Sequence, residues 1–86
     1  MVTQYAELCG WLIFHPLVSK GSRAGYPDLT MTRFRDRRMI FAELKRSRKE
    51  KLRPDQERWR EWLTRANQAY FLWTPELWPE IQSILR

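Results

Sequence analysis

Apolar residues recur at a helical spacing in the first segment of the chain and at a strand-like spacing directly after it. The apolar positions of the first segment lie three or four residues apart: Val2, Tyr5, Ala6 and Cys9. This spacing predicts a short amphipathic helix over residues 2–9, with Gly10 as a suitable stop. Residues 11–14 are all apolar and predict a first strand.

The middle of the chain has the pattern of a β-hairpin. Residues 20–25 contain two glycines and few apolar side chains, which predicts a loop. Residues 28–33 are rich in strand-forming types, and residues 39–44 are almost continuously apolar, as is typical of a strand buried on both faces. The mostly polar residues 34–38 between them predict the turn of the hairpin.

A second helix is predicted to begin at Pro54. Proline suits the first helical position, and Asp55 and Glu57 place negative charge in the first turn, where the helix dipole favours it. The residues that share one mainly apolar stripe of this segment are Leu52, Gln56, Trp59, Leu63 and Ala66. The stripe predicts the buried side of the helix, and it places one polar residue on that side.

The end of the chain predicts a fourth strand and a last helix. Residues 69–73 form the strand, after which Thr74 and Pro75 have the residue types that cap and begin a helix. The helix is expected over residues 76–85, where Pro79 either splits or restarts it. The predicted fold class is therefore α/β, a mixed β-sheet flanked by helices in the order α-β-β-β-α-β-α.

Length and charge narrow the class of protein. The 86 residues fit a single domain, residues 1–86. The net charge of +6 favours a polyanionic partner, most commonly nucleic acid, over a basic surface that is only solvated. A domain of this size forms a marginal core by itself, so an oligomer is a reasonable expectation, although its 5 Trp, 4 Phe and 3 Tyr partly compensate.

The cysteine content and the hydropathy pattern predict a cytoplasmic protein. Cys9 is the single cysteine, which excludes a disulfide framework and a cysteine-based zinc site and favours a reducing compartment. No apolar run approaches the roughly 20 residues of a membrane span. The first residues also lack the basic region and cleavage site of a signal peptide.

Two acidic residues and a lysine are expected to meet at one end of the hairpin. If the turn is centred between Arg35 and Asp36, then Asp28 and Glu43 lie directly opposite each other, with Cβ atoms about 4.5–5.5 Å apart. Lys45 is two residues beyond Glu43, so its side chain leaves the strand on the same face. A slip of one residue in the register would instead separate the two acids.

This arrangement has the chemistry of a metal-assisted phosphodiesterase. Two neighbouring carboxylates repel each other unless a cation lies between them, and Mg²⁺ commonly uses one or two carboxylates together with phosphate oxygens. Lys45 would orient or help to deprotonate the attacking water, or offset charge in the transition state. The alternative is a solvated acid pair with Lys45 as an ion-pair partner. The apolar run before Glu43 argues against it, because burying an unpaired charge is costly.

Three segments of the chain, taken in order, resemble a known nuclease family. They are Gly25-Tyr26-Pro27-Asp28-Leu29, Phe41-Ala42-Glu43-Leu44-Lys45 and Leu52-Arg53-Pro54-Asp55-Gln56. The set resembles the virus-type replication-repair nuclease (VRR-NUC) branch of the PD-(D/E)XK nuclease superfamily over essentially the whole chain. The resemblance implies a restriction-endonuclease-like fold, DNA cleavage, and Mg²⁺ or Mn²⁺ bound by Asp28, Glu43 and the main-chain carbonyl of Leu44. It also implies catalytic roles for Lys45 and Gln56.

The same resemblance suggests a substrate and an assembly. Small stand-alone members of the branch are phage-like or bacterial and resemble homodimeric Holliday-junction resolvases. We therefore expect a structure-selective endonuclease that acts on Holliday junctions or other branched DNA, as a homodimer, in a bacterial or phage-infected cell.

Two positions depart from the family pattern. The family carries a glutamate on its first helix that helps to complete the metal site, and Glu7 is the candidate here, although its spacing to Gly10 and Trp11 is short and it is otherwise an ordinary surface residue. Arg53 precedes the second helix where the family often has Ser or Thr, and arginine is a poor cap.

Basic and aromatic residues outside this set have less specific interpretations. The candidates for contacts with DNA phosphates are Arg23, Arg46, Arg48, Lys49 and Lys51, and a solvated loop is the alternative. Trp59 and Trp62 are assigned to the core or to a dimer contact in preference to base stacking.

Two other functions of the protein stay open. One is a DNA-binding module of degenerate nuclease fold, and the other is a small RNA-binding or assembly protein.

Overall fold

The predicted order of elements is confirmed. The computed structural model describes residues 1–16 and 24–86, so most of the loop predicted at 20–25 lies outside the described residues. The helices and strands are α1 (Val2–Leu8), β1 (Leu12–Phe14), β2 (Leu29–Arg33), β3 (Arg38–Leu44), α2 (Pro54–Arg65), β4 (Ala69–Trp73) and α3 (Trp78–Leu85). Two single-turn 3₁₀ helices, η1 (Phe34–Asp36) and η2 (Pro75–Leu77), replace the predicted hairpin turn and the predicted start of the last helix.

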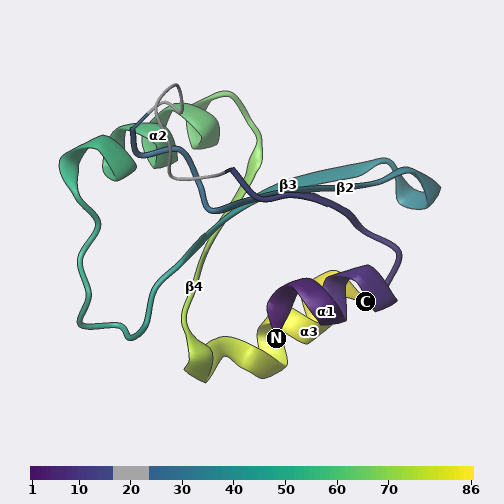
Figure 1. The fold of residues 1–86 in the computed structure, drawn as a ribbon. Coiled ribbons are helices and arrows are strands. Elements are labelled where there is room, and N and C mark those ends of the chain that lie inside the picture. Colours follow the sequence, from purple (N-terminus) through teal and green to yellow (C-terminus); the bar gives the residue numbers. More distant parts are fainter. Residues whose placement is uncertain (17–23) are drawn as a thin grey trace.

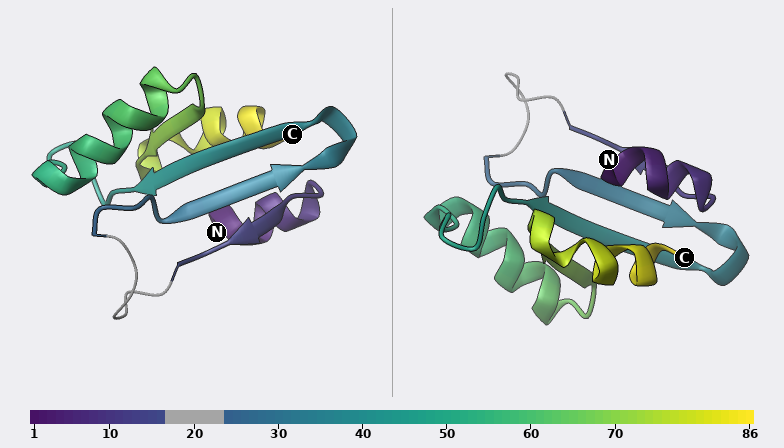
Figure 2. Two further views of the ribbon diagram at one scale, coloured as in Figure 1. Left: turned by 90° about the horizontal axis from the view of Figure 1, so that it is seen from above. Right: turned by 90° about the horizontal axis from the view of Figure 1, so that it is seen from below.

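The four strands form one mixed sheet in the order β1-β2-β3-β4. β1 and β2 pair antiparallel, as do β2 and β3, whereas β4 runs parallel to β3 and is reached through α2. Helices α1 and α3 cover one face of the sheet, and α2 lies on the other face (Figures 1 and 2). This is the α/β architecture with flanking helices that the sequence predicts.

The register of the β2–β3 hairpin agrees with the predicted turn centre. Leu29 pairs with Ala42, and Met31 pairs with Ile40. Extending this register by one residue places Asp28, just before β2, opposite Glu43. Because side chains alternate along a strand, these pairs also decide which residues face α1 and α3 and which face α2.

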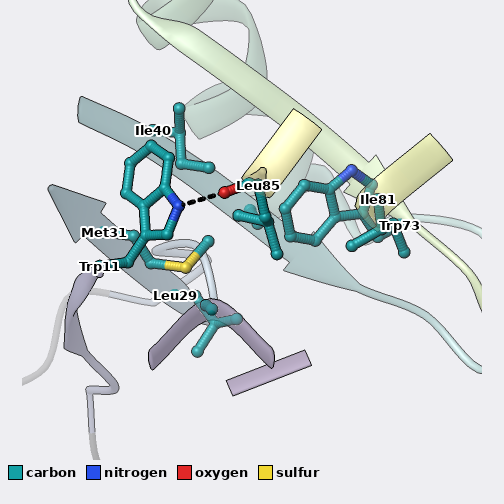
Figure 3. Close-up of a cluster of buried hydrophobic side chains, with 9 residues drawn as sticks. Trp11, Leu29, Met31, Ile40, Trp73, Ile81 and Leu85 are labelled. Carbon is teal, nitrogen blue, oxygen red and sulfur yellow. Dashed lines mark hydrogen bonds between the residues drawn. The ribbon is translucent and has the colours of Figure 1, made fainter. Parts of the chain in front are cut away.

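The main core lies between the sheet and the α1–α3 layer (Figure 3). Its buried members come from α1, from the strands and the residue before β1, and from α3. They are Ala6, Trp11, Leu29, Met31, Ile40, Ala42, Trp73, Ile81 and Leu85. The indole N–H of Trp11 donates a hydrogen bond of 2.9 Å to the carbonyl of Leu85, which satisfies the polar atom of this buried ring. Trp11 thus ties the start of β1 to the end of α3.

The helices differ from their predictions in two respects. The predicted stripe of α2 is buried only at Gln56, and Ala66 at the end of the stripe is exposed. Thr74 makes no side-chain capping bond; its carbonyl accepts from the N–H of Leu77, and α3 restarts with Pro79 in its first turn. Proline is tolerated there because the first N–H groups of a helix have no intrahelical acceptor.

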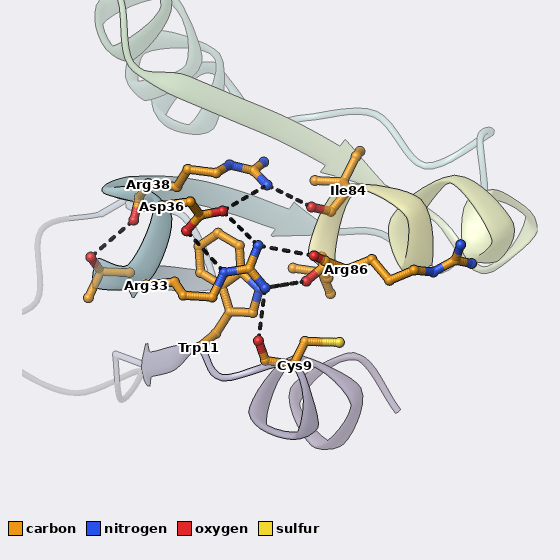
Figure 4. A network of polar contacts seen from close by, with 9 residues as sticks. Cys9, Trp11, Arg33, Asp36, Arg38, Ile84 and Arg86 are labelled. Carbon is orange, nitrogen blue, oxygen red and sulfur yellow. Dashed lines mark hydrogen bonds and ion pairs between the residues drawn. The ribbon is translucent and has the colours of Figure 1, made fainter.

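A buried arginine joins the ends of two helices (Figure 4). Arg33 is 4% exposed, and its guanidinium donates to both carboxylate oxygens of Asp36, at 3.1 and 2.8 Å. It also donates to the carbonyls of Cys9 and Leu85, each at 2.8 Å, and to that of Arg86 at 3.1 Å. A cation is favourable at these positions because the last carbonyls of α1 and α3 carry partial negative charge. The ion pair with Arg33 also holds the pKa of Asp36 below its usual value.

The sequence alone gives no sign that Arg33 is buried, because a strand-end arginine next to a polar turn is normally solvated. Arg38 extends the same cluster by donating to the carbonyl of Ile84 at 2.9 Å. Both guanidinium groups lie against the ring of Trp11, with centroid distances of 4.4 Å for Arg33 and 5.2 Å for Arg38. The cluster therefore combines charged hydrogen bonds with cation–π contacts.

Replacing Arg33 with lysine tests this cluster. An ammonium group lacks the planar fork that serves Asp36 and two helix ends together, so we expect Arg33→Lys to lose about 1.5–3 kcal/mol of unfolding free energy in urea denaturation. Arg35→Lys, at an exposed position of η1, is the matched control and should change stability by less than about 0.5 kcal/mol. Equal stability of the two variants would show that the cluster is not a stabilising element.

Candidate active site

The two predicted acids lie at the end of the hairpin that faces α2. Glu43 is on the central strand β3 and is 3% exposed, whereas Asp28 is partly buried directly before β2. The Oδ2 atom of Asp28 accepts a hydrogen bond of 2.8 Å from the backbone N–H of Leu44. This bond holds the Asp28 carboxylate against the end of β3, beside Glu43.

The main-chain carbonyl of Leu44 leaves β3 on the same edge as Asp28. The N–H and C=O of one strand residue point to the same side, and the Leu44 N–H points to Asp28. The next residue alternates: the N–H of Lys45 points to β4 and donates to the carbonyl of Trp73 at 2.9 Å. Two carboxylates and one carbonyl oxygen are thus available on one side of the strand end.

Gln56 connects the acid pair to Lys45. Its Nε2 donates to Oε2 of Glu43 at 3.0 Å, and its Oε1 accepts from Nζ of Lys45 at 3.1 Å. The same oxygen accepts from the backbone N–H of Arg53 at 2.8 Å. This network defines the orientation of the amide, because only the oxygen can accept from two donors.

The hydrogen bond between Gln56 and Arg53 also explains how α2 begins after a poor cap residue. The Arg53 side chain has no acceptor for the free N–H groups of the first turn. Instead, Oδ1 of Asp55 accepts from the N–H of Gln56 at 2.9 Å, and the Gln56 side chain reaches back to the Arg53 N–H, as the third residue of a capping box does. Gln56 therefore starts the helix and orients two site residues at once.

Burial and charge repulsion alter the protonation of Glu43. Desolvation and the neighbouring Asp28 raise the pKa of Glu43 to about 7, and Lys45 only partly opposes this. Tyr70, on β4, is affected by the same site: burial and the charge of Glu43 raise its pKa to about 12. Tyr70 was missed from the sequence, because only the parallel pairing of β3 with β4 brings it near Glu43.

Gly25 begins the first family segment, but its contact with α2 was not predicted from the sequence. Its φ of +84° lies in the left-handed region, and a Cβ atom there would lie 2.5 Å from the backbone carbon and oxygen of Asp55. The segment before Asp28 therefore runs directly against the first turn of α2. Tyr26 strengthens this contact, since its ring packs edge-on to Trp59 with a centroid distance of 4.8 Å.

Comparison with known proteins decides the family. A family model described as the VRR-NUC domain matches residues 14–73, which include Asp28, Glu43, Lys45 and Gln56. The chain belongs to the VRR-NUC domain family. It is also similar to a solved structure titled "VRR_NUC domain", with a TM-score of 0.75 and 26% identity over 98% of this chain and 89% of that chain. Functionally curated proteins gave no match.

Membership of the family makes this a nuclease-type domain, and it confirms the resemblance seen in the three sequence segments. The matched stretch begins after α1 and ends with β4, so Glu7 lies outside it. In the structure Glu7 is exposed on α1, which covers the opposite face of the sheet from α2. The VRR-NUC fold therefore brings Asp28, Glu43, Lys45 and Gln56 together and leaves Glu7 apart.

Four of the five basic candidates follow Lys45 in the sequence. Arg46, Arg48, Lys49 and Lys51 are exposed in the segment between β3 and α2, and Arg23 lies outside the described residues. Arg48 lies 3.7 Å from the carboxylate of Glu76. Within residues 1–16 and 24–86, no group of three or more His, Cys, Asp or Glu side chains is arranged to hold a metal, so the site offers two carboxylates.

The raised pKa of Glu43 predicts a dependence of stability on pH. Between the usual value of 4.5 and about 7, the folded state of the VRR-NUC domain binds a proton that the unfolded state has lost. Without divalent cations, stability should therefore fall as the pH rises through this range, by about 2–3 kcal/mol. Glu43→Gln should remove the fall and be more stable than the parent protein near pH 8, as measured by urea denaturation. Glu57→Gln, at an exposed position of α2, is the control; a parallel profile for both variants would contradict the assignment.

The close approach of Gly25 to α2 predicts that the two positive-φ glycines tolerate alanine differently. Gly10 also has a positive φ, of +90°, but a Cβ there would meet only the Arg33 side chain at 3.7 Å. Gly10→Ala should cost about 1–2 kcal/mol of stability from backbone strain alone. Gly25→Ala should cost a further 1–3 kcal/mol or so, because the first turn of α2 has to move. Equal losses in urea denaturation would show that the contact is easily relaxed.

Proposed function

We propose that this VRR-NUC domain is a divalent-metal-dependent DNA endonuclease that hydrolyses phosphodiester bonds. The observation that carries the proposal is the pairing of Asp28 with buried Glu43, beside a lysine whose ammonium group is held by Gln56. Such a set places acidic oxygens and a fixed cation around one point at the end of a central strand. Nuclease chemistry requires both.

The donor set fits Mg²⁺ or Mn²⁺. These cations prefer oxygen ligands and commonly use one or two carboxylates, with water and substrate phosphate completing the shell. Asp28, Glu43 and the carbonyl of Leu44 would hold the ion. Burial, and after it the charge of Asp28, raise the pKa of Glu43, and a bound cation would offset both effects. In that site the ion supplies Lewis acidity at the scissile phosphate.

Lys45 and Gln56 are assigned separate roles in the reaction. Lys45 donates from its ammonium group toward the reacting phosphoryl oxygens or the attacking water, and so offsets the negative charge that develops there. Gln56 is a positioning residue, since it binds both Lys45 and Glu43 and is itself fixed by the start of α2. The buried environment of Glu43 strengthens these electrostatic interactions.

The surface charge supports DNA as the substrate. The net charge of +6 attracts a phosphate backbone, and the exposed basic residues after β3 begin directly beside the site. Arg46, Arg48, Lys49 and Lys51 are proposed to contact phosphates on either side of the cleaved bond.

In the part of the chain that the structure describes, no helix is long and apolar enough to cross a membrane.

We further propose that the enzyme acts on branched DNA as a homodimer. On the α2-facing side of the sheet, within the described residues, Leu12 and Phe14 of β1 and Met39 of β3 are 75%, 60% and 48% exposed. The strand pairing places Leu12 and Met39 on either side of Thr32, so these side chains share one face. A second copy seated on this apolar face would present two active sites to a junction.

A binding module without activity is the second candidate. It is favoured by the finding that the described residues provide two carboxylates and that Glu7 lies on the opposite side of the sheet. A module of this kind would bind DNA through its basic surface but would have no need for a metal at Asp28 and Glu43.

Cleavage assays separate the two candidates. With Mg²⁺ or Mn²⁺, the protein should cut a Holliday junction faster than linear duplex DNA, and chelation by EDTA should abolish cleavage. Asp28→Asn and Lys45→Ala should each reduce kcat by about 100-fold or more while DNA binding in a gel shift is retained. Glu7→Gln is the control and should cut at the parent rate. Cleavage by Asp28→Asn at the parent rate would refute the proposed site, and metal-independent binding without cleavage would favour the binding module.

A further inference from the structure

A cavity of about 470 Å³ lies beside α2, outside the set of residues assigned to catalysis. Among the described residues it is lined by Ala24, Asp55, Arg58, Trp59 and Trp62. Trp62 is 63% exposed, so it is not part of the core, and the alternative assignment to a dimer contact stays a prediction. A tryptophan this exposed next to a cavity leaves a large flat apolar surface in water, which is typical of a binding site.

The two tryptophans that line the cavity differ in their contacts. The indole N–H of Trp59 donates to the carbonyl of Ala24 at 3.1 Å, and its ring packs edge-on against Tyr26. Trp62 instead has the guanidinium of Arg58 over its ring, 5.6 Å from the centroid. Trp59 is therefore bound to the segment that leads to Asp28, whereas the exposed Trp62 has a positive charge over its ring.

We propose that this cavity binds an unpaired nucleobase of the DNA strand next to the cleavage site, an inference that rests on the proposed nuclease function. A base is a flat aromatic group that stacks on Trp62, while the charge of Arg58 attracts the adjoining phosphate. Asp55 supplies an acceptor for the amino groups of a base edge. Among the described residues, both hydrogen bonds to the Asp55 carboxylate go to Oδ1, from Gln56 N–H and Arg53 Nε, so Oδ2 faces no competing donor.

The cavity and the active site share their supporting elements. Asp55 lines the cavity, and the next residue, Gln56, binds Glu43 and Lys45. The backbone of Gly25 lies against both Asp55 and Gln56, so the two sites are held together by one contact. A base seated in the cavity keeps its strand beside the acid pair. The site therefore selects DNA with unpaired nucleotides near the cut, such as a flap or an open junction, over fully paired duplex.

Binding measured in EDTA tests the inference without relying on cleavage. Two DNA ligands with the same number of phosphates are compared by fluorescence anisotropy: a duplex with a single-stranded arm and a fully paired duplex. We expect the parent protein to bind the armed ligand more tightly. Trp62→Ala should weaken binding of the armed ligand by about tenfold, the size of one lost base stack, and leave duplex binding unchanged.

Matched variants exclude simpler explanations. Phe34→Ala removes another highly exposed aromatic, at the hairpin tip, and should bind both ligands like the parent protein. Arg58→Ala should weaken the armed ligand more than Arg60→Ala, which removes the same charge from an α2 position outside the cavity. Trp62→Phe should retain most of the preference, because a phenyl ring still stacks.

A change in the DNA gives a test that needs no mutation. Abasic nucleotides in the single-stranded arm should weaken binding of the parent protein by the same factor as Trp62→Ala, and the two changes together should cause no further loss. Equal weakening of both ligands by Trp62→Ala, or no weakening of either, would overturn the inference. So would a change of oligomeric state in Trp62→Ala, measured by light scattering, since the surface would then be a contact between copies. A preference for the armed ligand that depends on Trp62 would support the cavity as a site for an unpaired base, even if the protein cuts no DNA.

Discussion

The register between β2 and β3 is the constraint on which both halves of the structure depend. With Leu29 opposite Ala42, the residue before β2 lies opposite Glu43 on the α2 side of the sheet. The same register turns Arg33 to the other side, where it binds the ends of α1 and α3. A slip by one residue would move the acids apart and turn a guanidinium out of its cluster, so the site and the helix packing depend on the same pairing.

Gln56 links the folding of α2 to the chemistry of the strand end. Its side-chain oxygen completes the first turn of the helix and holds Lys45, while its amide nitrogen binds Glu43. It is also the buried residue of α2, although its neighbours on the helix face are more exposed. This polar side chain on a predicted core face has three hydrogen-bond partners, and two of them, Glu43 and Lys45, are residues of the candidate site. Burial, and after it the charge of Asp28, raise the pKa of Glu43, so the rest of the fold holds this carboxyl in a place that disfavours its charged form.

One face of the sheet provides the packing of the domain, and the other face carries the candidate active site. The face under α1 and α3 contains the hydrophobic core and the arginine cluster, and it provides most of the packing. The face under α2 contains the acid pair and the exposed apolar side chains of β1, and the cavity beside Trp62 is lined mainly by α2 itself. This division explains how a domain of 86 residues combines a closed core with several exposed features that suit DNA or a second copy.

Local sequence patterns determined the elements, the hairpin and the acid pair of this protein. Helical spacing in the first segment, an apolar run ending in Glu43, and a turn centred between Arg35 and Asp36 are all short-range features, and short-range features determine secondary structure and the register of a hairpin. Strand alternation placed Lys45 on the same face as Glu43, and the family motif added Gln56. By contrast, the roles of residues whose partners are distant in sequence followed only from the tertiary structure.

Arg33 is buried because two helix ends, one from each end of the chain, converge on it. Tyr70 meets the site through parallel pairing across α2, and Gly25 is required where a loop touches the first turn of that helix. Trp62 is exposed because α2 turns that side away from the sheet, whereas its sequence spacing is equally consistent with burial. Sequence periodicity identifies a face of a helix or strand, but only the packing of distant elements decides what that face meets.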